Sequence, residues 1–349
     1  ITSMTREALK ETGLDNKAVV KCKNMFALGI CFWLFDRPED YALKYLDGKF
    51  AKKNPAVAQA NKLAIAAGYN YAANTHQFAN NYTVAPAPRE KGTYRSINGN
   101  VATAWGLCAA AEKAGLPLFC GSYPITPATV ILEELAKRKD LGVKTVQAED
   151  EIAGICTAIG AAFAGNFAVT TTSGPGLSLK SEALGLAVMT ELPLVVVDVQ
   201  RGGPSTGLPT KTEQSDLQQA LYGRNGECPV IVVAASSPSD CFHYAFEAGR
   251  LAMEHMTPVI LLTDGFIANG SEPWRIPEMK DYPAIQPPIV DKAPEGGFMP
   301  YVRNEKLARG WAFPGKVGLE HRVGGLEKDC VKGCISHDPA NHQKMTDTR

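Results

Sequence analysis

The chain has 349 residues, of which 45% are hydrophobic and 21% charged, and Lys+Arg and Asp+Glu each number 36. This length allows two or three domains, and the composition is that of a globular protein. A net charge of zero provides no basic field for nucleic acid or an anionic membrane, and no apolar run reaches the length of a membrane span. We therefore expect neither partner.

The first 98 residues divide into a helical part and a linker. Residues 21–35 are apolar enough to be buried, and 41–50 and 55–67 have the spacing of amphipathic helices. The polar stretch 76–98, with Pro86 and Pro88, predicts an extended linker and a domain boundary near residue 90. The sequence begins at Ile1 without a signal-peptide pattern, so we expect residues 1–75 to be the end of a longer domain.

From residue 100 onward, helical and strand patterns alternate. Helices are predicted over 101–114, 128–138, 151–164, 177–190 and 239–254, and strands over 116–119, 145–148, 167–172, 193–199, 229–235 and 258–263. This alternation predicts an α/β fold with a doubly wound parallel sheet in residues 99–275. Ligands bind at the carboxyl ends of such strands. The loops Y-P-I-T-P, A-E-D-E, T-S-G-P-G and Q-R-G-G-P-S-T-G-L-P-T should therefore gather at one edge.

The last part of the chain, 276–349, is proline-rich at first and irregular. We expect it to lead to a further domain. The nine cysteines of the chain form no C-x-x-C pair, and Cys330 and Cys334 are too few for a cluster site. Their odd number and scattered positions indicate reduced thiols, as in a cytoplasmic protein.

The stretch Cys120–Pro127, C-G-S-Y-P-I-T-P, joins a predicted strand to a predicted helix. Thr126 suits the N-cap position, and Pro127 suits the first helical turn, where its missing N–H costs nothing. A helix N-terminus also attracts anionic ligands. A simple capped helix start explains the same residues, and capping alone favours that interpretation.

Three acids, Glu149, Asp150 and Glu151, lie at the next strand–helix junction. Acids are favoured there by the helix dipole, and Asp150 is the best N-cap among them. The helix that follows is so apolar that Glu151 could instead be partly buried and functional. The sequence leaves both interpretations open.

Two further loops have the residues of a ligand site. Ser173-Gly174-Pro175-Gly176 follows a strand, and its glycines allow either close approach to a ligand or a tight turn. Arg201 follows the most hydrophobic strand and can clamp a carboxylate through two parallel hydrogen bonds. A surface ion pair is the alternative for Arg201, but the glycines after it favour a ligand-facing loop. We interpret Asp264-Gly265 as a turn, and no phosphate-binding glycine motif occurs.

Four motifs in order resemble those of the alpha subunit of 2-oxoacid:ferredoxin oxidoreductases, most closely the 2-oxoglutarate type with a fused gamma domain. They are Tyr123–Pro127, 147–153 (Q-A-E-D-E-I-A), Thr172–Gly176 and 200–210. Residues 1–75 resemble the end of the gamma domain, with K-N-M-F-A-L-G at 23–29, and 99–275 resemble the domain that binds the pyrimidine of thiamine diphosphate. Residues 318–338 resemble the segment that leads to the next domain.

This resemblance implies the oxidative decarboxylation of a 2-oxoacid with thiamine diphosphate, coenzyme A and ferredoxin. It also implies a beta subunit that holds Mg²⁺ and a [4Fe-4S] cluster, a dimer of alpha–beta units, and no metal site in this chain. By position, Glu151 and Thr126 match catalytic residues. Thr126, Arg201 and Thr210 match substrate-binding residues. The matching cofactor-binding residues are Tyr123, Pro124, Ile125, Glu151, Ser173 and Gly174.

Two alternatives remain. The chain could be a pyruvate or branched-chain 2-oxoacid member of the same family, or a non-catalytic scaffolding subunit that retains the fold. Intact Thr126, Glu151 and Arg201 argue against the scaffolding role.

Overall fold

Helices form the first of two units into which the chain divides, Ile1–Lys91 and Gly92–Arg349. The computed structural model describes residues 1–75 and 77–349. The first unit contains α1 (Thr2–Ala8), η1 (Lys10–Thr12), α2 (Asn16–Lys21), α3 (Lys23–Leu34), α4 (Asp40–Leu46), η2 (Asp47–Ala51) and α5 (Pro55–Asn74). Asn54 caps α5 by accepting a hydrogen bond from the N–H of Val57 at 3.2 Å, and Pro55 occupies the first turn.

The core of the first unit lies between α3 and α5. Gly29 of α3 and Gly68 of α5 each lie so near the backbone of the other helix that a Cβ would collide with it, so small residues set the helix spacing. The predicted burial of residues 21–35 is only partly correct. Phe26 is buried, but Cys31 and Phe35 are exposed, because only one face of α3 packs against α5.

Six parallel strands form the sheet of the second unit, in the order β3-β2-β4-β5-β7-β6. They are β2 (Leu118–Ser122), β3 (Lys144–Gln147), β4 (Phe167–Thr172), β5 (Leu194–Gln200), β6 (Ile231–Ala234) and β7 (Pro258–Asp264). Every residue of β4, β5 and β7 is buried, because helices cover both faces of the central strands. The predicted parallel sheet is confirmed.

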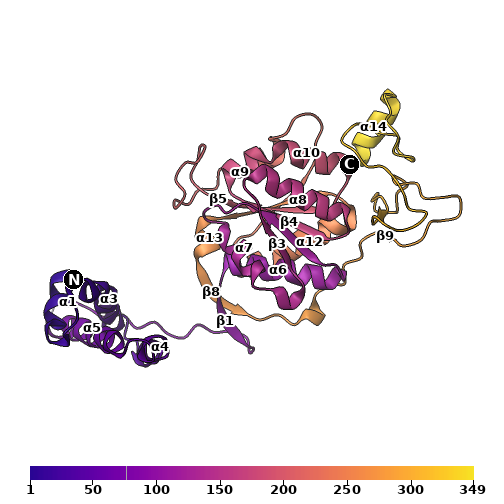
Figure 1. Cartoon of the computed structure of the whole chain (residues 1–349). Coiled ribbons are helices and arrows are strands. Elements are labelled where there is room, and N and C mark those ends of the chain that lie inside the picture. The colour runs from indigo at the N-terminus through magenta and orange to yellow at the C-terminus, as the bar shows by residue number, and fades with distance from the viewer. Residues whose placement is uncertain (76) are drawn as a thin grey trace. The chain divides into compact units, whose positions relative to one another are not determined.

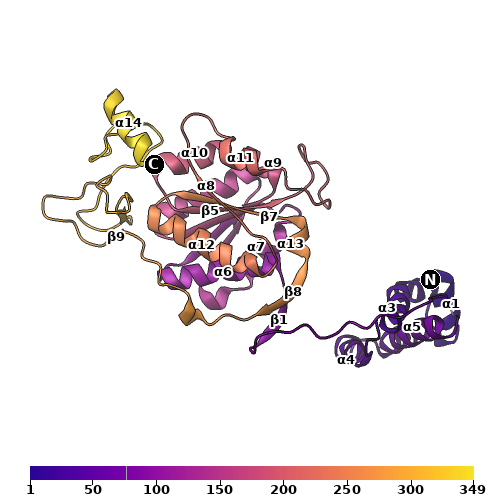
Figure 2. The same cartoon turned by 180° about the vertical axis from the view of Figure 1, so that it is seen from behind.

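Two helical layers enclose this sheet. Figure 1 shows α8 (Glu151–Phe163), α9 (Gly174–Leu179) and α10 (Ser181–Thr190) on one side, and α6 (Gly99–Ala114) and α7 (Thr129–Ala136) on the other. The reverse view in Figure 2 shows α12 (Asp240–His255) with α6 and α7, and α11 (Leu217–Tyr222) with α8 and α9. Alternate residues of β5 belong to different layers: Val195 and Val197 pack towards α6 and α12, and Leu194 and Val196 pack towards α8 and α10.

The carboxyl ends of the four neighbouring strands β3, β2, β4 and β5 meet at one edge of the sheet. The loops that leave these ends are the four loops picked out in the sequence, so their predicted gathering follows directly from the strand order. On the far side of β5, strand β7 leads into α13 (Gly265–Asn269). Asp264 caps α13 by accepting from the N–H of Phe266 at 2.7 Å, so the predicted turn at this position is instead a helix start.

Two segments predicted to be irregular contain helices or strands in the structure. Residue 76, the first of the predicted 76–98 linker, lies outside the described residues. The last five linker residues form β1 (Tyr94–Asn98), which pairs antiparallel with β8 (Ser271–Arg275) from much later in the chain. The predicted irregular segment 276–349 also contains η4 (Met279–Asp281), β9 (Ile289–Val290), β10 (Trp311–Ala312) and α14 (Pro339–Thr348). Both differences depend on pairing partners distant in sequence.

The helix after the Y-P-I-T-P loop begins later than predicted. Its N-cap is Ala128, so the prediction that Thr126 caps it and Pro127 occupies its first turn is wrong. The backbone carbonyls of these two residues accept hydrogen bonds from side chains instead, from Arg201 at 2.6 Å and from Asn100 at 3.0 Å. These contacts come from elements distant in the chain and hold both residues before the helix, where local capping preference does not place them.

The predicted helix 177–190 is two helices, α9 and α10, joined at Lys180. The N–H of Lys180 bonds to the carbonyls of both Gly176 and Leu177, which tightens the turn there. Between β2 and β3 lies a short turn, η3 (Lys139–Leu141). No helix in the part of the chain that the structure describes is both long and apolar enough to cross a membrane.

We predict that Gly106→Ala destabilises the second unit by about 1–3 kcal/mol, since overpacking a tight contact costs that much. A Cβ at Gly106 of α6 would collide with the backbone oxygen of Phe242 in α12 and lie 2.9 Å from Cβ of Ala245. Chemical unfolding monitored by circular dichroism measures the effect.

The matched control is Gly160→Ala in α8, where nothing lies within 4 Å of the added Cβ. This substitution should be neutral or stabilise by up to about 1 kcal/mol through helix propensity. Equal effects of the two substitutions would contradict the close packing of α6 on α12.

Candidate functional site

The loop after β2 is fixed at both ends and open at its middle. At its start, Ser122 is buried and its hydroxyl bonds to the Thr171 carbonyl of β4 at 2.7 Å. At its end, Asn100 bonds to the Pro127 carbonyl. Between these anchors, Tyr123 and Thr126 are exposed. Two of the predicted site residues of this loop, Tyr123 and Thr126, are therefore presented to solvent, whereas Pro124 and Ile125 are half-buried.

Arg201 links this loop to the loop after β5. Its side chain is 5% exposed, and its two terminal nitrogens donate to the backbone carbonyls of Thr126 at 2.6 Å and Thr206 at 2.8 Å. Nε of Arg201 is buried without a hydrogen-bond partner among the described residues. The structure thus brings Arg201 and Thr126 together, although through the threonine backbone and not its hydroxyl.

A cavity of about 620 Å³ opens beside Arg201. It is lined by residues of α9, of the loop that connects β5 to α11 and of α11 itself, among them Gly174, Ser178, Thr206, Asp216 and Gln219. Thr210 lies on the exposed part of the same loop, and the residues that line this cavity do not include it. The cavity is large enough for a small organic acid.

The three acids at the start of α8 have different positions in the structure. Asp150 is the N-cap, as the sequence predicts, and accepts from the N–H of Ala153 at 2.7 Å. Glu149 is exposed, whereas Glu151 is 8% exposed. Glu151 is therefore the acid that is enclosed at the carboxyl edge of the sheet.

The Ser173–Gly176 loop lies directly against Glu151. A Cβ at Gly176 would collide with the hydroxyl of Thr172 and lie 2.8 Å from Cγ of Glu151, so only glycine allows this approach. The hydroxyl of Ser173 is buried and has no hydrogen-bond partner in the described part of the chain. A close backbone and an available buried hydroxyl fit a ligand that passes over this loop.

A buried cation, Lys180, supports the same corner. Its side chain is fully enclosed, and Nζ donates to the backbone carbonyl of Glu151 at 2.7 Å. Burial lowers the pKa of Lys180 to about 8, and the nearby carboxylates of Glu151 and Asp150 partly oppose this shift. This role of Lys180 could not be predicted, because a lysine in a helical pattern is usually solvent-exposed.

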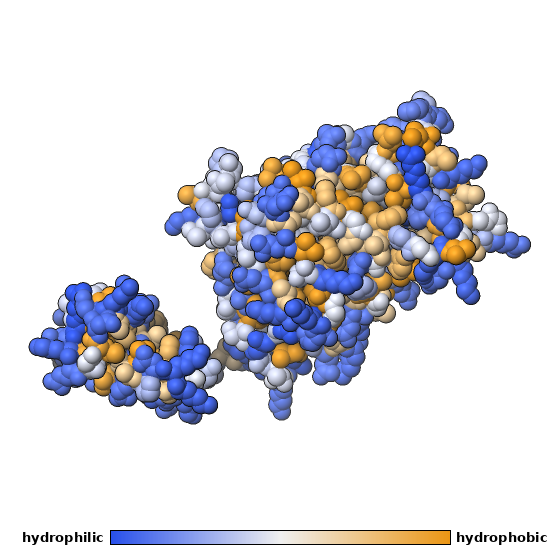
Figure 3. Space-filling model, viewed as in Figure 1, coloured by the Kyte–Doolittle hydropathy of each residue, from blue (hydrophilic) through white to orange (hydrophobic). Residues whose placement is uncertain are grey.

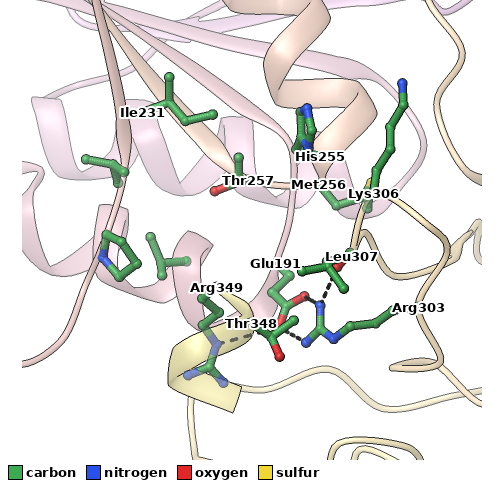
Figure 4. A pocket seen from close by; sticks show the side chains of 13 residues that line it. Glu191, Ile231, His255, Met256, Thr257, Arg303, Lys306, Leu307, Thr348 and Arg349 are labelled. Carbon is green, nitrogen blue, oxygen red and sulfur yellow. Dashed lines mark hydrogen bonds and ion pairs between the residues drawn. The ribbon is translucent and has the colours of Figure 1, made fainter. Parts of the chain in front are cut away.

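A second pocket, of about 230 Å³, lies at the opposite edge of the sheet, near the start of β6 and β7 (Figure 4). Arg303 donates to both carboxylate oxygens of Glu191 there, at 2.6 and 2.8 Å, and Arg349 approaches the same carboxylate at 3.5 Å. These ion pairs hold residues of the C-terminal segment against the end of α10. The pocket is remote from the loops of the carboxyl edge.

A protein-family model matches the part of the chain that contains the carboxyl edge of the sheet. The model described as "Pyruvate flavodoxin/ferredoxin oxidoreductase, thiamine diP-bdg" matches residues 110–335, which is more than half of the chain. The chain belongs to this family. Membership confirms the fold expected from the sequence and the resemblance on which it rested.

Individual relatives agree with this assignment. The chain is 55% identical over 350 residues to 2-oxoglutarate oxidoreductase subunit KorA of Mycobacterium tuberculosis, covering 100% of this chain and 53% of the relative. It is 43% identical over 250 residues to 2-oxoglutarate synthase subunit KorA of Methanothermobacter marburgensis, covering 71% and 64%. The chain thus spans about half to two thirds of the length of these curated relatives.

A solved structure is also similar over almost the whole chain. It is the 2-oxoglutarate:ferredoxin oxidoreductase from Magnetococcus marinus with 2-oxoglutarate, coenzyme A and succinyl-CoA bound. The TM-score is 0.85 at 36% sequence identity, and the match covers 99% of this chain and 58% of that one. The predicted similarity to the 2-oxoglutarate type of alpha subunit is therefore confirmed.

We predict that Lys180→Met removes a pH dependence of folding stability. Because the folded-state pKa of Lys180 is about 8, the unfolded chain binds a proton that the folded chain lacks from there up to about pH 10. Wild-type stability relative to Lys180→Met should therefore increase as the pH rises through this interval. Denaturant titrations at several pH values measure the difference, and a constant difference would contradict the buried, partly deprotonated lysine.

Proposed function

We propose that this chain is the alpha half of a 2-oxoglutarate:ferredoxin oxidoreductase, which decarboxylates 2-oxoglutarate oxidatively with coenzyme A and passes electrons to ferredoxin. The observation that carries this proposal is the arrangement at the carboxyl edge, where Glu151, the Ser173–Gly176 loop, Thr126 and Arg201 lie on neighbouring strands. The names of the relatives support the choice of 2-oxoglutarate over other 2-oxoacids.

Thiamine diphosphate is the cofactor that this edge would hold. When bound, it supplies an electron sink for the charge left when a 2-oxoacid loses its carboxylate. Ser173 and Gly174, on the loop that lies against Glu151, would contact the ring together with Tyr123, Pro124 and Ile125. Glu151 would share a proton with the pyrimidine ring nitrogen, for which an enclosed carboxyl is suited.

Arg201 and Thr126 would bind the substrate, with Thr210 in addition. Each terminal nitrogen of Arg201 uses one N–H on a backbone carbonyl, so the second N–H on each stays available for a carboxylate. The two carbonyl bonds hold the guanidinium still, which limits the entropy lost on binding. The hydroxyl of Thr126 lies on the exposed tip of the neighbouring loop.

A partner subunit would complete the site. Several large apolar side chains are exposed after the carboxyl ends of the strands, and they include Tyr123, Ile152, Leu179, Leu208 and Phe266. Apolar residues are visible among hydrophilic ones on the face drawn in Figure 3. Exposed apolar surface beside a site is typical of a protein interface. We infer that a beta subunit covers this edge and brings Mg²⁺ and the [4Fe-4S] cluster, in a dimer of alpha–beta units.

We retain a cytoplasmic location as part of the proposal. All nine cysteines are free thiols rather than disulfides. Reduced thiols are typical of a reducing compartment.

Partner dependence tests the function. The polypeptide that contains this chain should show no 2-oxoacid-dependent ferredoxin reduction by itself and should gain activity when its beta subunit is added, with 2-oxoglutarate preferred in a panel of 2-oxoacids. Preference for pyruvate or a branched-chain 2-oxoacid would change the substrate. Lack of activity in the assembled complex would favour a scaffolding subunit.

We predict that Arg201→Ala lowers kcat/KM for 2-oxoglutarate in the assembled enzyme by a factor equivalent to roughly 2–4 kcal/mol of transition-state stabilisation. Arg201→Lys keeps the charge but loses the planar fork and one of the carbonyl bonds, so it should also be impaired. Thr126→Val tests the hydroxyl at similar shape and leaves the backbone bond to Arg201 in place. An unchanged kcat/KM in Arg201→Ala would rule out the substrate role.

We predict that Glu151→Gln slows proton exchange at the reactive carbon of bound thiamine diphosphate by about a hundredfold or more, on general acid–base magnitudes. The fold and the partner contact should persist, because size and shape barely change. Exchange into deuterium oxide, followed by NMR of the assembled complex, isolates this step.

Glu149→Gln is the matched control, since Glu149 lies two residues away and is exposed. It should exchange at the wild-type rate. Slow exchange in Glu149→Gln together with normal exchange in Glu151→Gln would transfer the role to Glu149.

A further inference from the structure

A carboxyl group lies in the centre of the sheet, where no mechanism described above uses it. Asp198 belongs to β5, is 0% exposed, and has Thr172 of β4 and Leu262 of β7 as its neighbours in register. Its side chain continues the row of Leu194 and Val196 on the α8 side of the sheet. Neither of its oxygens has a hydrogen-bond partner among the described residues. An ionised carboxylate in such a place is strongly disfavoured.

A second carboxyl, that of Asp216, lies beside Asp198. The backbone N–H of Asp216 bonds to Gln200, two residues further along β5, and its carboxyl lies against Gly174, two residues after the Thr172 that neighbours Asp198 in register. Burial and the neighbouring Asp216 carboxyl raise the pKa of Asp198 well above its usual range, and burial also raises the pKa of Asp216. Asp216 is held from the backbone side, because its N–H donates to Oε1 of Gln200 at 2.9 Å. Two carboxylates that face each other offer acceptors only, whereas one proton between them provides the missing donor.

Asp216 in turn packs against the proposed cofactor loop. A Cβ at Gly174 would lie 2.6 Å from Oδ2 of Asp216, so this carboxyl lies directly against the loop backbone. Oδ2 is buried and has no partner in the described part of the chain, and Asp216 lines the cavity beside Arg201. The position of Asp216 therefore determines both the loop and one wall of the cavity.

We propose that Asp198 is a protonated carboxylic acid that donates a hydrogen bond to Asp216, and that this bond positions the Ser173–Gly176 loop and the wall of the Arg201 cavity. Both residues are positioning residues, because they act through the loop and not on the substrate. The pair holds one proton shared between two carboxyl groups. If that proton is lost, two like charges face each other in the core and the loop loses its support.

Few other charged groups surround the pair. Glu213, on the same loop as Asp216, adds negative charge and raises the pKa of Asp216, and Arg201 lines the same cavity. On β7, the carboxyl of Asp264 is already used by Gln214 and by backbone N–H groups of α13. From α9, the neighbours that line the cavity are all uncharged: Gly174, Pro175, Ser178 and Leu179.

Infrared spectroscopy of the purified protein, without any partner subunit, tests the protonation directly. A protonated carboxylic acid has a carbonyl stretch that is separate from the carboxylate bands. The wild-type minus Asp198→Asn difference spectrum at neutral pH should contain this band. Its absence would overturn the proposal. This measurement needs no turnover, so it is independent of whether the proposed function is correct.

A comparison of two substitutions tests positioning, and its kinetic part rests on the proposed function. Asp198→Val removes the donor and should speed amide hydrogen exchange in residues 173–180 and lower kcat/KM by about tenfold or more, as for an unpaired buried acceptor. Asp198→Asn keeps an N–H donor and should restore most of both properties. In the wild type, kcat/KM should fall as rising pH removes the shared proton. In Asp198→Asn this fall should be absent.

Glu254→Gln is the control, since Glu254 is also a buried carboxyl but has a lowered pKa and is paired with Arg250 and Lys306 away from this edge. Its loop exchange and kcat/KM should match the wild type. Equal loop exchange in Asp198→Val and the wild type would overturn the positioning role. An Asp198→Asn enzyme as impaired as Asp198→Val would overturn the need for a donor.

Discussion

The geometry of the carboxyl edge of the sheet depends on the hydrogen bonds of the buried Arg201 guanidinium. This guanidinium lies between two loops that leave neighbouring parts of the sheet and bonds to a carbonyl in each, at Thr126 and Thr206. Five donors in one plane can serve two loops and still offer N–H groups to a ligand. Thr126 itself lies before helix α7, which begins at Thr129. Thr126 therefore does not cap the helix, and its backbone instead bonds to Arg201, 75 residues further along the chain.

Small residues and buried polar groups act together around this arginine. Gly176 lets the loop after β4 approach Glu151, and Gly174 lets it approach Asp216. Lys180 holds the backbone of Glu151 in place by donating a hydrogen bond from Nζ to its carbonyl. Each of these groups is enclosed and would be expensive to leave unpaired, so the contacts restrict the edge to one arrangement. A rigid half-site is useful if a second subunit must complete it, because less order is then gained on assembly.

Much of the fold could be predicted from local pattern. The run L-V-V-V-D-V predicts a central buried strand, the alternation of strands and helices predicts the parallel sheet, and the capping role of Asp150 follows from its side chain. The contacts of Arg201, Lys180 and Asp216 could not be predicted, because each joins elements distant in the chain. Asp198 is the exception: a lone acid within a buried strand is a visible signal of a special role. The pairing of β1 with β8 had no such signal.

We propose that the carboxyl edge of this sheet is one half of a thiamine diphosphate site. The most direct test is an electron cryo-microscopy structure of the protein with its beta subunit, thiamine diphosphate and Mg²⁺. We expect the Glu151 carboxyl within hydrogen-bond distance of the pyrimidine ring nitrogen, over the Ser173–Gly176 loop, with Arg201 facing the same cavity. A pyrimidine ring bound at any other edge of the sheet, or against Glu149, would contradict this proposal.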